Sequence, residues 1–257
     1  MLELNIERRR WWDFLVVMTT KEIKVRYKMT LIGLSWAFLN PVIQMLVMGI
    51  VFRFFVPVKV DNYFIFLFSG LLLWNFVSLT ISRSTTIIIN ERMLIQKSMF
   101  PREILVLSVV AGNLIHLLIS LGLLLIVLIF LGYLSWSWIL LPLILLPVVA
   151  LVSGISLLLS ALNVRFRDIN FVSQVMVSLW FYVSPILYTL DLLPEKFVKY
   201  FLFNPLTGIL DFTRALLIGM PLKFLWIDIL SLGWCIWLFV VGILVFKKTS
   251  RKFDEWV

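Results

Sequence analysis

The chain has 257 residues, of which 62% are hydrophobic and only 14% are charged, whereas a soluble domain usually has about 25% charged residues. This composition, with a mean hydropathy of +1.05, excludes an ordinary soluble domain and indicates an integral membrane protein. The formal net charge of +9 is assigned to cations that flank membrane spans on the cytoplasmic side, and no nucleic-acid partner is expected.

The first predicted element is an amphipathic helix over residues 10–30. Apolar residues at helical spacing share one stripe of it: Trp11, Phe14, Leu15, Met18 and Val25. Lys21, Lys24 and Lys28 point elsewhere. A helix of this pattern lies in the headgroup plane with its cations toward anionic lipid. A cytoplasmic helix packed on protein is the alternative.

Mainly apolar segments of about 20 or more residues, long enough to cross a bilayer, predict an all-α fold with six transmembrane helices in a single domain over residues 1–257. The uncharged stretch from 104 to 164 is too long for one helix, and its YLSWSW motif indicates a hairpin tip. The predicted spans are residues 31–52, 62–82, 104–131, 137–162, 169–190 and 224–246. Pro41 should kink the first span, either to shape a lumen or as a packing bend.

The connection after the second span predicts a short amphipathic helix over residues 90–100. Asn90 is placed to cap this helix, and Pro101 ends it, because a proline disfavours helix at the residue before it. Such a helix at the cytoplasmic face is suited to docking into a partner protein. A plain loop is the alternative.

The segment between the last two spans, residues 191–222, is amphipathic and contains prolines and two half-length apolar runs. Neither run is long enough to cross the bilayer alone, which favours interfacial or re-entrant, gate-like helices. An ordinary outer loop is the alternative.

The distribution of Lys and Arg predicts the orientation of the chain. Six spans place both termini on one side of the membrane. Most of the cations lie on that side, in residues 1–30, 83–103, 163–169 and 247–257. The positive-inside rule therefore places both termini in the cytoplasm.

The chain lacks the motifs of an enzyme or of a self-powered pump. No G-x-x-x-x-G-K-[ST] segment is present to hold nucleotide phosphates, and no residue cluster has metal-ligand spacing. The single histidine, His116, lies inside a predicted span, and we interpret it as a packing residue. The first five predicted spans contain no Asp, Glu, Lys or Arg, which disfavours an ion-coupled carrier or a cation channel with an acidic filter.

Several segments together resemble ABC-2 type exporter permeases, and most of all the polysaccharide (O-antigen) export branch of that family. They occur in the family's order from about residue 20 to residue 220: KVRYKMTLIGLSWAFLNPVIQ, NERMLIQKSMFPREILVLS, RFRDIN, FYVSPILY and FNPLTGILDFTRALLIG. The first carries the basic-aromatic Arg26-Tyr27-Lys28 segment, then Gly33, Trp36 and Pro41.

This resemblance implies a homodimer of six-span chains in the bacterial inner membrane, each paired with a separate ATPase subunit. ATP and Mg would bind to that subunit, so no cofactor and no enzymatic activity are expected on this chain. The substrate would be a polysaccharide on a polyprenyl-diphosphate lipid, and residues 191–222 would form a periplasmic gate. The expected contacts with the ATPase are Glu91, Arg92, Met93, Leu94, Ile95, Gln96, Lys97, Arg165 and Arg167.

Aromatic side chains are expected to line the substrate channel, because the C–H faces of sugars pack on aromatic rings. The predicted lining residues are Trp36, Phe38, Trp180, Phe181 and Tyr182. They cannot all face one lumen, since consecutive residues splay around a helix. Aromatic residues that face lipid or the membrane interface are the alternative.

Two cations are expected at the substrate entrance on the cytoplasmic side. Arg26 and Lys28 lie just before the first span, where they could bind the diphosphate of a lipid-linked substrate. Anchoring in lipid headgroups is the alternative. Other functions remain open at this point: export of teichoic acid, capsule or a small lipid or drug, a membrane-embedded lipid-modifying enzyme, or a membrane scaffold without a lumen.

Overall fold

The computed structural model describes residues 2–27, 33–55, 62–251 and 253. Within these residues the chain is entirely helical and contains no strand. The α-helices are α1 Leu2–Tyr27, α2 Trp36–Phe55, α3 Tyr63–Asn90, α4 Arg92–Lys97, α5 Glu103–Phe130, α6 Leu141–Arg165, α7 Ile169–Val183, α8 Glu195–Val198, α9 Leu206–Ile218 and α10 Leu225–Ser250. The 3-10 helices are η1 Gly33–Ser35, η2 Trp136–Leu140, η3 Leu190–Leu192 and η4 Lys199–Phe203.

The prediction of an all-α membrane protein is confirmed. Among the described residues, four helices are long and apolar enough to cross a bilayer: α3, α5, η2 with α6, and α10. A fifth candidate is the pair formed by 195–203 and α9, which is bent by 101°. The helices that overlap predicted spans 31–52 and 169–190 contain shorter apolar stretches. We expected α7 to reach residue 190, but it ends at Val183, just before the Ser184-Pro185 pair.

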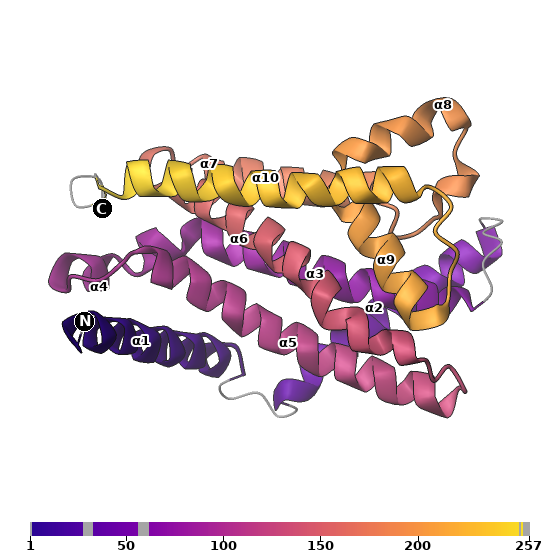
Figure 1. The fold of residues 1–257 in the computed structure, drawn as a ribbon, viewed down its shortest axis with the longest axis horizontal. Helices are drawn as coiled ribbons and strands as arrows, with labels where there is room; N and C mark the ends of the chain where they lie inside the picture. The colour runs from indigo at the N-terminus through magenta and orange to yellow at the C-terminus, as the bar shows by residue number, and fades with distance from the viewer. Residues whose placement is uncertain (1, 28–32, 56–61, 252, 254–257) are drawn as a thin grey trace.

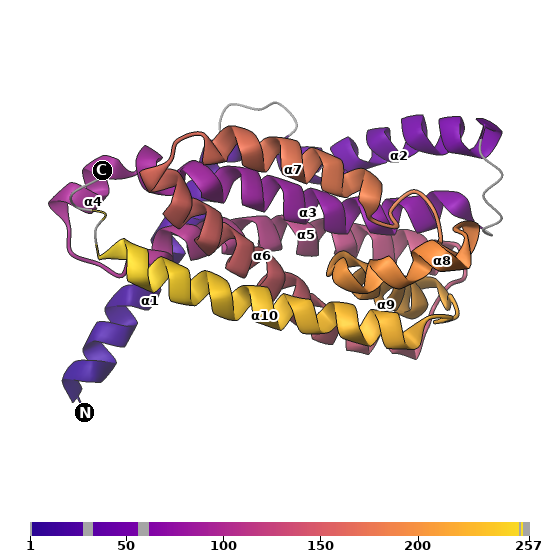
Figure 2. The same cartoon turned by 90° about the horizontal axis from the view of Figure 1, so that it is seen from above.

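Helix α3 forms the centre of the bundle. It packs against α2, α5, α6, α7 and α9, and its side chains Phe66, Leu67, Leu71 and Val77 are completely buried. A helix that is apolar around most of its circumference is buried in this way. In Figure 2, α2 and α7 lie along one side of the bundle and α10 lies along the other.

Two glycines allow α6 and α10 to approach closely. A Cβ atom on Gly154 would lie 2.5 Å from the backbone oxygen of Leu238, and a Cβ atom on Gly242 would overlap the backbone of Gly154. Small residues at such positions let membrane helices pack backbone to backbone. The two helices can therefore approach this closely because Gly154 and Gly242 have no side chains.

The two ends of the bundle differ in content, as Figure 1 shows. One end, here called the α4 end, carries α1, α4 and the C-terminal part of α10. The opposite end, the α9 end, carries α8, α9 and the turn between α5 and α6. The side chain of Asn204 fixes the chain at the break before α9, because it accepts from Trp180 Nε1 at 2.9 Å and from the backbone N–H of Leu206 at 3.1 Å.

Candidate functional site

The residues predicted to contact an ATPase lie at the α4 end. Helix α4 is six residues long, shorter than the predicted 90–100, and Asn90 is the last residue of α3 instead of its cap. Ile95 is buried and Leu94 packs beside it, in a cluster that contains Leu105 and Phe246. The outward side chains are Arg92, Met93, Gln96 and Lys97. Arg165 and Arg167 are also exposed, at the turn between α6 and α7.

Helix α1 is attached to this end by polar contacts. Lys21 Nζ lies 2.5 Å from Glu91 Oε1, and Arg83 Nη1 lies 3.8 Å from Glu22 Oε2. A Cβ atom on Gly112 of α5 would lie 3.4 Å from the Cβ of Glu22, an ordinary van der Waals distance, so α1 and α5 lie close together at this position. One side of α1 therefore packs on protein.

The predicted apolar stripe of α1 is divided between this packed side and the surface. Met18 is buried, and the ring of Phe14 lies 4.9 Å from that of Phe100. Val25 is exposed, as are Trp12 and Val16, which lie outside the predicted stripe. The predicted bounds 10–30 compare with Leu2–Tyr27 for α1, and residues 28–30 lie outside the described residues.

A cavity of about 630 Å³ lies where α1, α2, α3 and α5 meet. We call it the basic pocket, and it is lined by Arg26, Trp36, Asn40, Pro41, Asn75, Leu79, Arg83 and His116. Two residues predicted from sequence, Arg26 and Trp36, thus come together. Lys28, the other predicted cation at the entrance, lies outside the described residues.

The hydrogen bonds around the basic pocket hold its polar walls in place. Arg26 Nη2 donates to Asn113 Oδ1 at 2.5 Å, and Asn75 Nδ2 donates to Gln44 Oε1 at 3.2 Å. The guanidinium-bearing residues Arg26 and Arg83 both line the basic pocket, together with the amide residues Asn40 and Asn75. Guanidinium groups bind phosphate oxygens in a planar, two-pronged geometry, so the basic pocket is suited to an anionic ligand.

Sequence reasoning missed four polar residues of this pocket: Asn40, Asn75, Arg83 and His116. A signal was present, because Asn75, Leu79 and Arg83 are four residues apart and therefore share one face of α3. His116, interpreted above as a packing residue, is only partly buried and lines the cavity wall. Ionisable side chains at membrane depth are energetically costly, and those that occur usually serve a function.

The five aromatic residues predicted to line a channel have different surroundings. Trp36 is 43% exposed and Tyr182 is 66% exposed, whereas Phe181 is buried against Trp74 with ring centroids 5.4 Å apart. Phe38 is partly buried and meets the ring of Phe68 edge to face at 5.3 Å. Trp180 is partly buried and bonded to Asn204. The surface of one chain therefore presents mainly Trp36 and Tyr182.

Helices α2 and α7 lie along the top of the bundle in Figure 2, and both carry exposed large apolar side chains. On α2 the exposed large apolar residues are Ile43, Leu46, Val47, Ile50 and Val51. On α7 they are Phe171, Val172, Val175, Met176, Leu179, Tyr182 and Val183. In a membrane protein such faces contact lipid or another protein chain.

Comparison with known proteins identifies the family. Residues 14–218 match the family described as ABC-2 type transporter. The chain is 34% identical over 247 residues, 95% of each chain, to a Klebsiella pneumoniae protein named O-antigen export system permease protein RfbA. It is 29% identical over 219 residues, 84% of each chain, to a Myxococcus xanthus protein of the same name. The resemblance noted in the sequence is therefore confirmed, and the chain is a multi-pass membrane protein that belongs to the ABC-2 type transporter family.

Proposed function

We propose that this chain is the permease subunit of an ATP-driven ABC exporter that moves a lipid-linked polysaccharide of the O-antigen type out of the cytoplasm. The similarity over 95% of the chain to a permease named for O-antigen export supports the transport function and the substrate class. The observation within the structure that supports a diphosphate-linked substrate is the basic pocket, where Arg26 and Arg83 line one cavity with Trp36.

The ATPase is a separate subunit that binds ATP and Mg, since the chain has no nucleotide-binding motif. It docks at the α4 end. The buried side chain of Ile95 packs α4 against the bundle. The outward-facing residues of α4 are Arg92, Met93, Gln96 and Lys97, which supports α4 as the docking element. Arg165 and Arg167 extend this surface with two more cations.

The chain crosses the inner membrane six times with both termini in the cytoplasm. Helix α2 has 20 residues, about 30 Å at 1.5 Å per residue, which matches the thickness of the hydrocarbon core. Helix α7 is shorter, and the segment from Ser184 to Thr189 completes its crossing. The bent α8–α9 region forms the periplasmic gate, and its 101° bend between residues 195–203 and α9 supports a re-entrant path.

The transporter is a homodimer in which the apolar faces of α2 and α7 face the second copy. These two helices lie on the same side of α3 and expose large apolar side chains there. Trp36 and Tyr182 belong to the same two helices, so a passage between two copies would have aromatic rings on its walls. Arg26 and Lys28 attract the anionic substrate to the entrance of that passage, and the diphosphate of the lipid binds in the basic pocket.

The proposal is tested by co-expressing the tagged chain with its candidate ATPase subunit and purifying the complex from membranes. We expect the ATPase to co-purify and to hydrolyse ATP, and cells that carry both subunits to export the polysaccharide. The double variant Arg92→Glu with Lys97→Glu should lose the ATPase, because both exposed cations of α4 are reversed.

The matched control is Lys247→Glu with Lys248→Glu, which reverses two exposed cations of α10 at the same end. This variant should keep the ATPase. A well-folded chain that never binds an ATPase would overturn the proposal. If the complex hydrolyses ATP but the cells display no surface polysaccharide, the chain remains an exporter subunit and a glycan is rejected as its substrate.

A further inference from the structure

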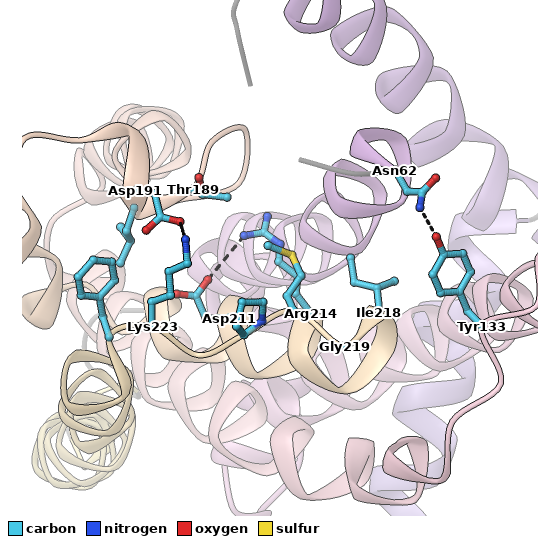
Figure 3. Close-up of a pocket in the computed structure, with 13 residues that line it drawn as sticks. Asn62, Tyr133, Thr189, Asp191, Asp211, Arg214, Ile218, Gly219 and Lys223 are labelled. Carbon is cyan, nitrogen blue, oxygen red and sulfur yellow. Dashed lines mark hydrogen bonds and ion pairs between the residues drawn. The ribbon is translucent and has the colours of Figure 1, made fainter. Parts of the chain in front are cut away.

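A second cavity, of about 510 Å³, opens at the α9 end. Figure 3 shows Asp191 and Lys223 facing each other on one side of it, Asn62 and Tyr133 on the opposite side, and Asp211 with Arg214 between them. These residues come from five separate segments: the start of α3, the turn after α5, η3, α9 and the loop before α10. We call this cavity the outer pocket. Its volume lies within the range of about 300–1,000 Å³ that is usual for small-molecule sites.

The outer pocket is built on a buried cation. Arg214 is only 1% exposed. Its Nη1 donates to Pro185 O at 2.7 Å and its Nη2 donates to Ile186 O at 3.0 Å. The guanidinium carbon lies 3.5 Å from the ring centroid of Phe66. These contacts hold the guanidinium group in one position.

The Nε atom of Arg214 is buried and has no hydrogen-bond partner among the described residues. Leaving a buried donor unpaired typically costs about 1–3 kcal/mol. Arg214 also lines the outer pocket, so its guanidinium group contributes a fixed positive charge to the pocket wall.

The rim of the outer pocket is polar but electrically balanced. Two acidic and two basic side chains line it: Asp191, Asp211, Arg214 and Lys223. Lys223 Nζ donates to Asp191 Oδ2 at 2.6 Å, and both side chains remain about half exposed. Asn62 donates to the hydroxyl of Tyr133. Because the charges balance, the outer pocket does not attract a strongly anionic ligand, in contrast to the basic pocket.

We propose that the outer pocket binds an uncharged sugar unit of the exported glycan as it leaves the transporter. This inference rests on the proposed function and deepens it. Sugar hydroxyls both donate and accept, so they can use the carboxylates and the cations of the rim together. The rings of Tyr133 and Phe224 supply apolar surface for the C–H face of a sugar. The site lies at the end of the bundle opposite the ATPase surface, where the exported glycan would leave the transporter.

The test measures binding to the purified complex of the chain and its ATPase in lipid nanodiscs. The probe is the mixture of oligosaccharides released by mild acid from the O-polysaccharide of the source strain, and binding is followed by saturation-transfer NMR and calorimetry. Asp191→Asn and Lys223→Gln should each weaken binding about tenfold, the loss expected for one hydrogen bond to a charged group. Both residues are exposed, so the variants should fold.

Two controls carry the same chemical changes on α8. Glu195→Gln and Lys196→Gln alter exposed residues that do not line the outer pocket, and they should bind the oligosaccharides like the unmodified complex. Equal binding by all four variants would overturn the inference. So would a co-purifying phospholipid that is lost only from the two pocket variants, because the outer pocket would then be a lipid site.

Export by the unmodified transporter is measured in cells in parallel. If polysaccharide reaches the surface but the purified complex does not bind the oligosaccharides, the outer-pocket inference fails and the proposed function stands. If no polysaccharide is exported although the complex hydrolyses ATP, the proposed glycan export fails, and with it the identity of the ligand.

Discussion

Arg26 shows how one side chain can belong both to the architecture and to a binding surface. It lies at the end of α1, donates to Asn113 of α5 at 2.5 Å, and lines the basic pocket. A guanidinium group has five donors in a fixed fork, so one side chain can contact several groups at once. The same residue can therefore join two helices and contact a phosphate.

We expect Arg26→Gln to lower polysaccharide export at least about tenfold, because a charge-assisted contact with phosphate typically contributes about 1.5–3 kcal/mol. Export is measured as surface polysaccharide per amount of transporter in the membrane. Lys24→Gln, on the same helix but outside the pocket, should export normally. Asn113→Ala removes the amide oxygen that accepts from Arg26 Nη2 and leaves the guanidinium group in place. If it reduced export as strongly as Arg26→Gln, the helix contact and not the cation would be what matters.

Arg214 joins α9 to the segment that follows α7. Its replacement by Met leaves the carbonyls of Pro185 and Ile186 without their donors and removes the ion pair with Asp211, whose Oδ1 lies 3.8 Å away. We expect a loss of about 2–4 kcal/mol in the free energy of unfolding, measured by thermal and denaturant unfolding in detergent.

Lys223→Met is the reference for this measurement. It breaks an ion pair between half-exposed side chains, which should contribute less than about 1 kcal/mol. Similar losses in the two variants would mean that the buried position of Arg214 adds nothing to stability.

At the scale of helices, the sequence predicted the long apolar elements better than the ends of the short ones. Tyr63–Asn90 and Glu103–Phe130 follow from long apolar runs. However, α3 continues past Arg83, where the uncharged stretch ends. The charge of Arg83 is accommodated by Glu22 of α1, a contact between distant segments that a local pattern does not contain.

The basic pocket was predicted only in part for a similar reason. Arg26 and Trp36 were identified from their place before and within the first span, and the spacing of Asn75 and Arg83 along α3 was visible in the sequence. Their meeting with His116 requires the packing of four helices around one cavity. The outer pocket depends even more on packing, since its walls come from five segments and its central cation, Arg214, looks like an ordinary amphipathic residue in the sequence.

The contact between α6 and α10 gives a test at this scale. Gly242→Ala places a methyl group onto the backbone of Gly154, and overpacking of this kind typically costs about 1–3 kcal/mol. The variant should melt at a lower temperature in detergent and leave less monodisperse protein after heating.

Gly233→Ala is the matched control in the same helix, because no atom lies within 4 Å of the added Cβ. It should be neutral or stabilising by about 0.4–1 kcal/mol. If Gly242→Ala also left the melting temperature unchanged, the α6–α10 contact would have room for a methyl group, contrary to the close approach seen in the structure.

At the scale of the whole molecule, the proposed homodimer predicts which surfaces meet. Cysteines introduced at Val47 of α2 and Val175 of α7 should give covalent dimers with a short bifunctional thiol reagent in membranes. Cysteines at Leu143 and Leu146 of α6, which are equally exposed in one chain, should remain monomeric because lipid covers them. The native Cys235 is completely buried, so background labelling should be low. Efficient dimers from the α6 positions alone would place the partner elsewhere.

The contacts between α1 and α4 have a thermodynamic consequence. Lys21 binds Glu91, the residue just before α4, and Arg26, five residues further along α1, lines the basic pocket. Wherever docking at α4 shifts α1, it shifts the pocket wall as well. Linkage then requires reciprocity: filling the pocket must change the affinity for the docked subunit by the same factor as docking changes the affinity for the pocket's ligand. A transporter with substrate in the basic pocket would thus bind its ATPase with a changed affinity before any ATP is hydrolysed.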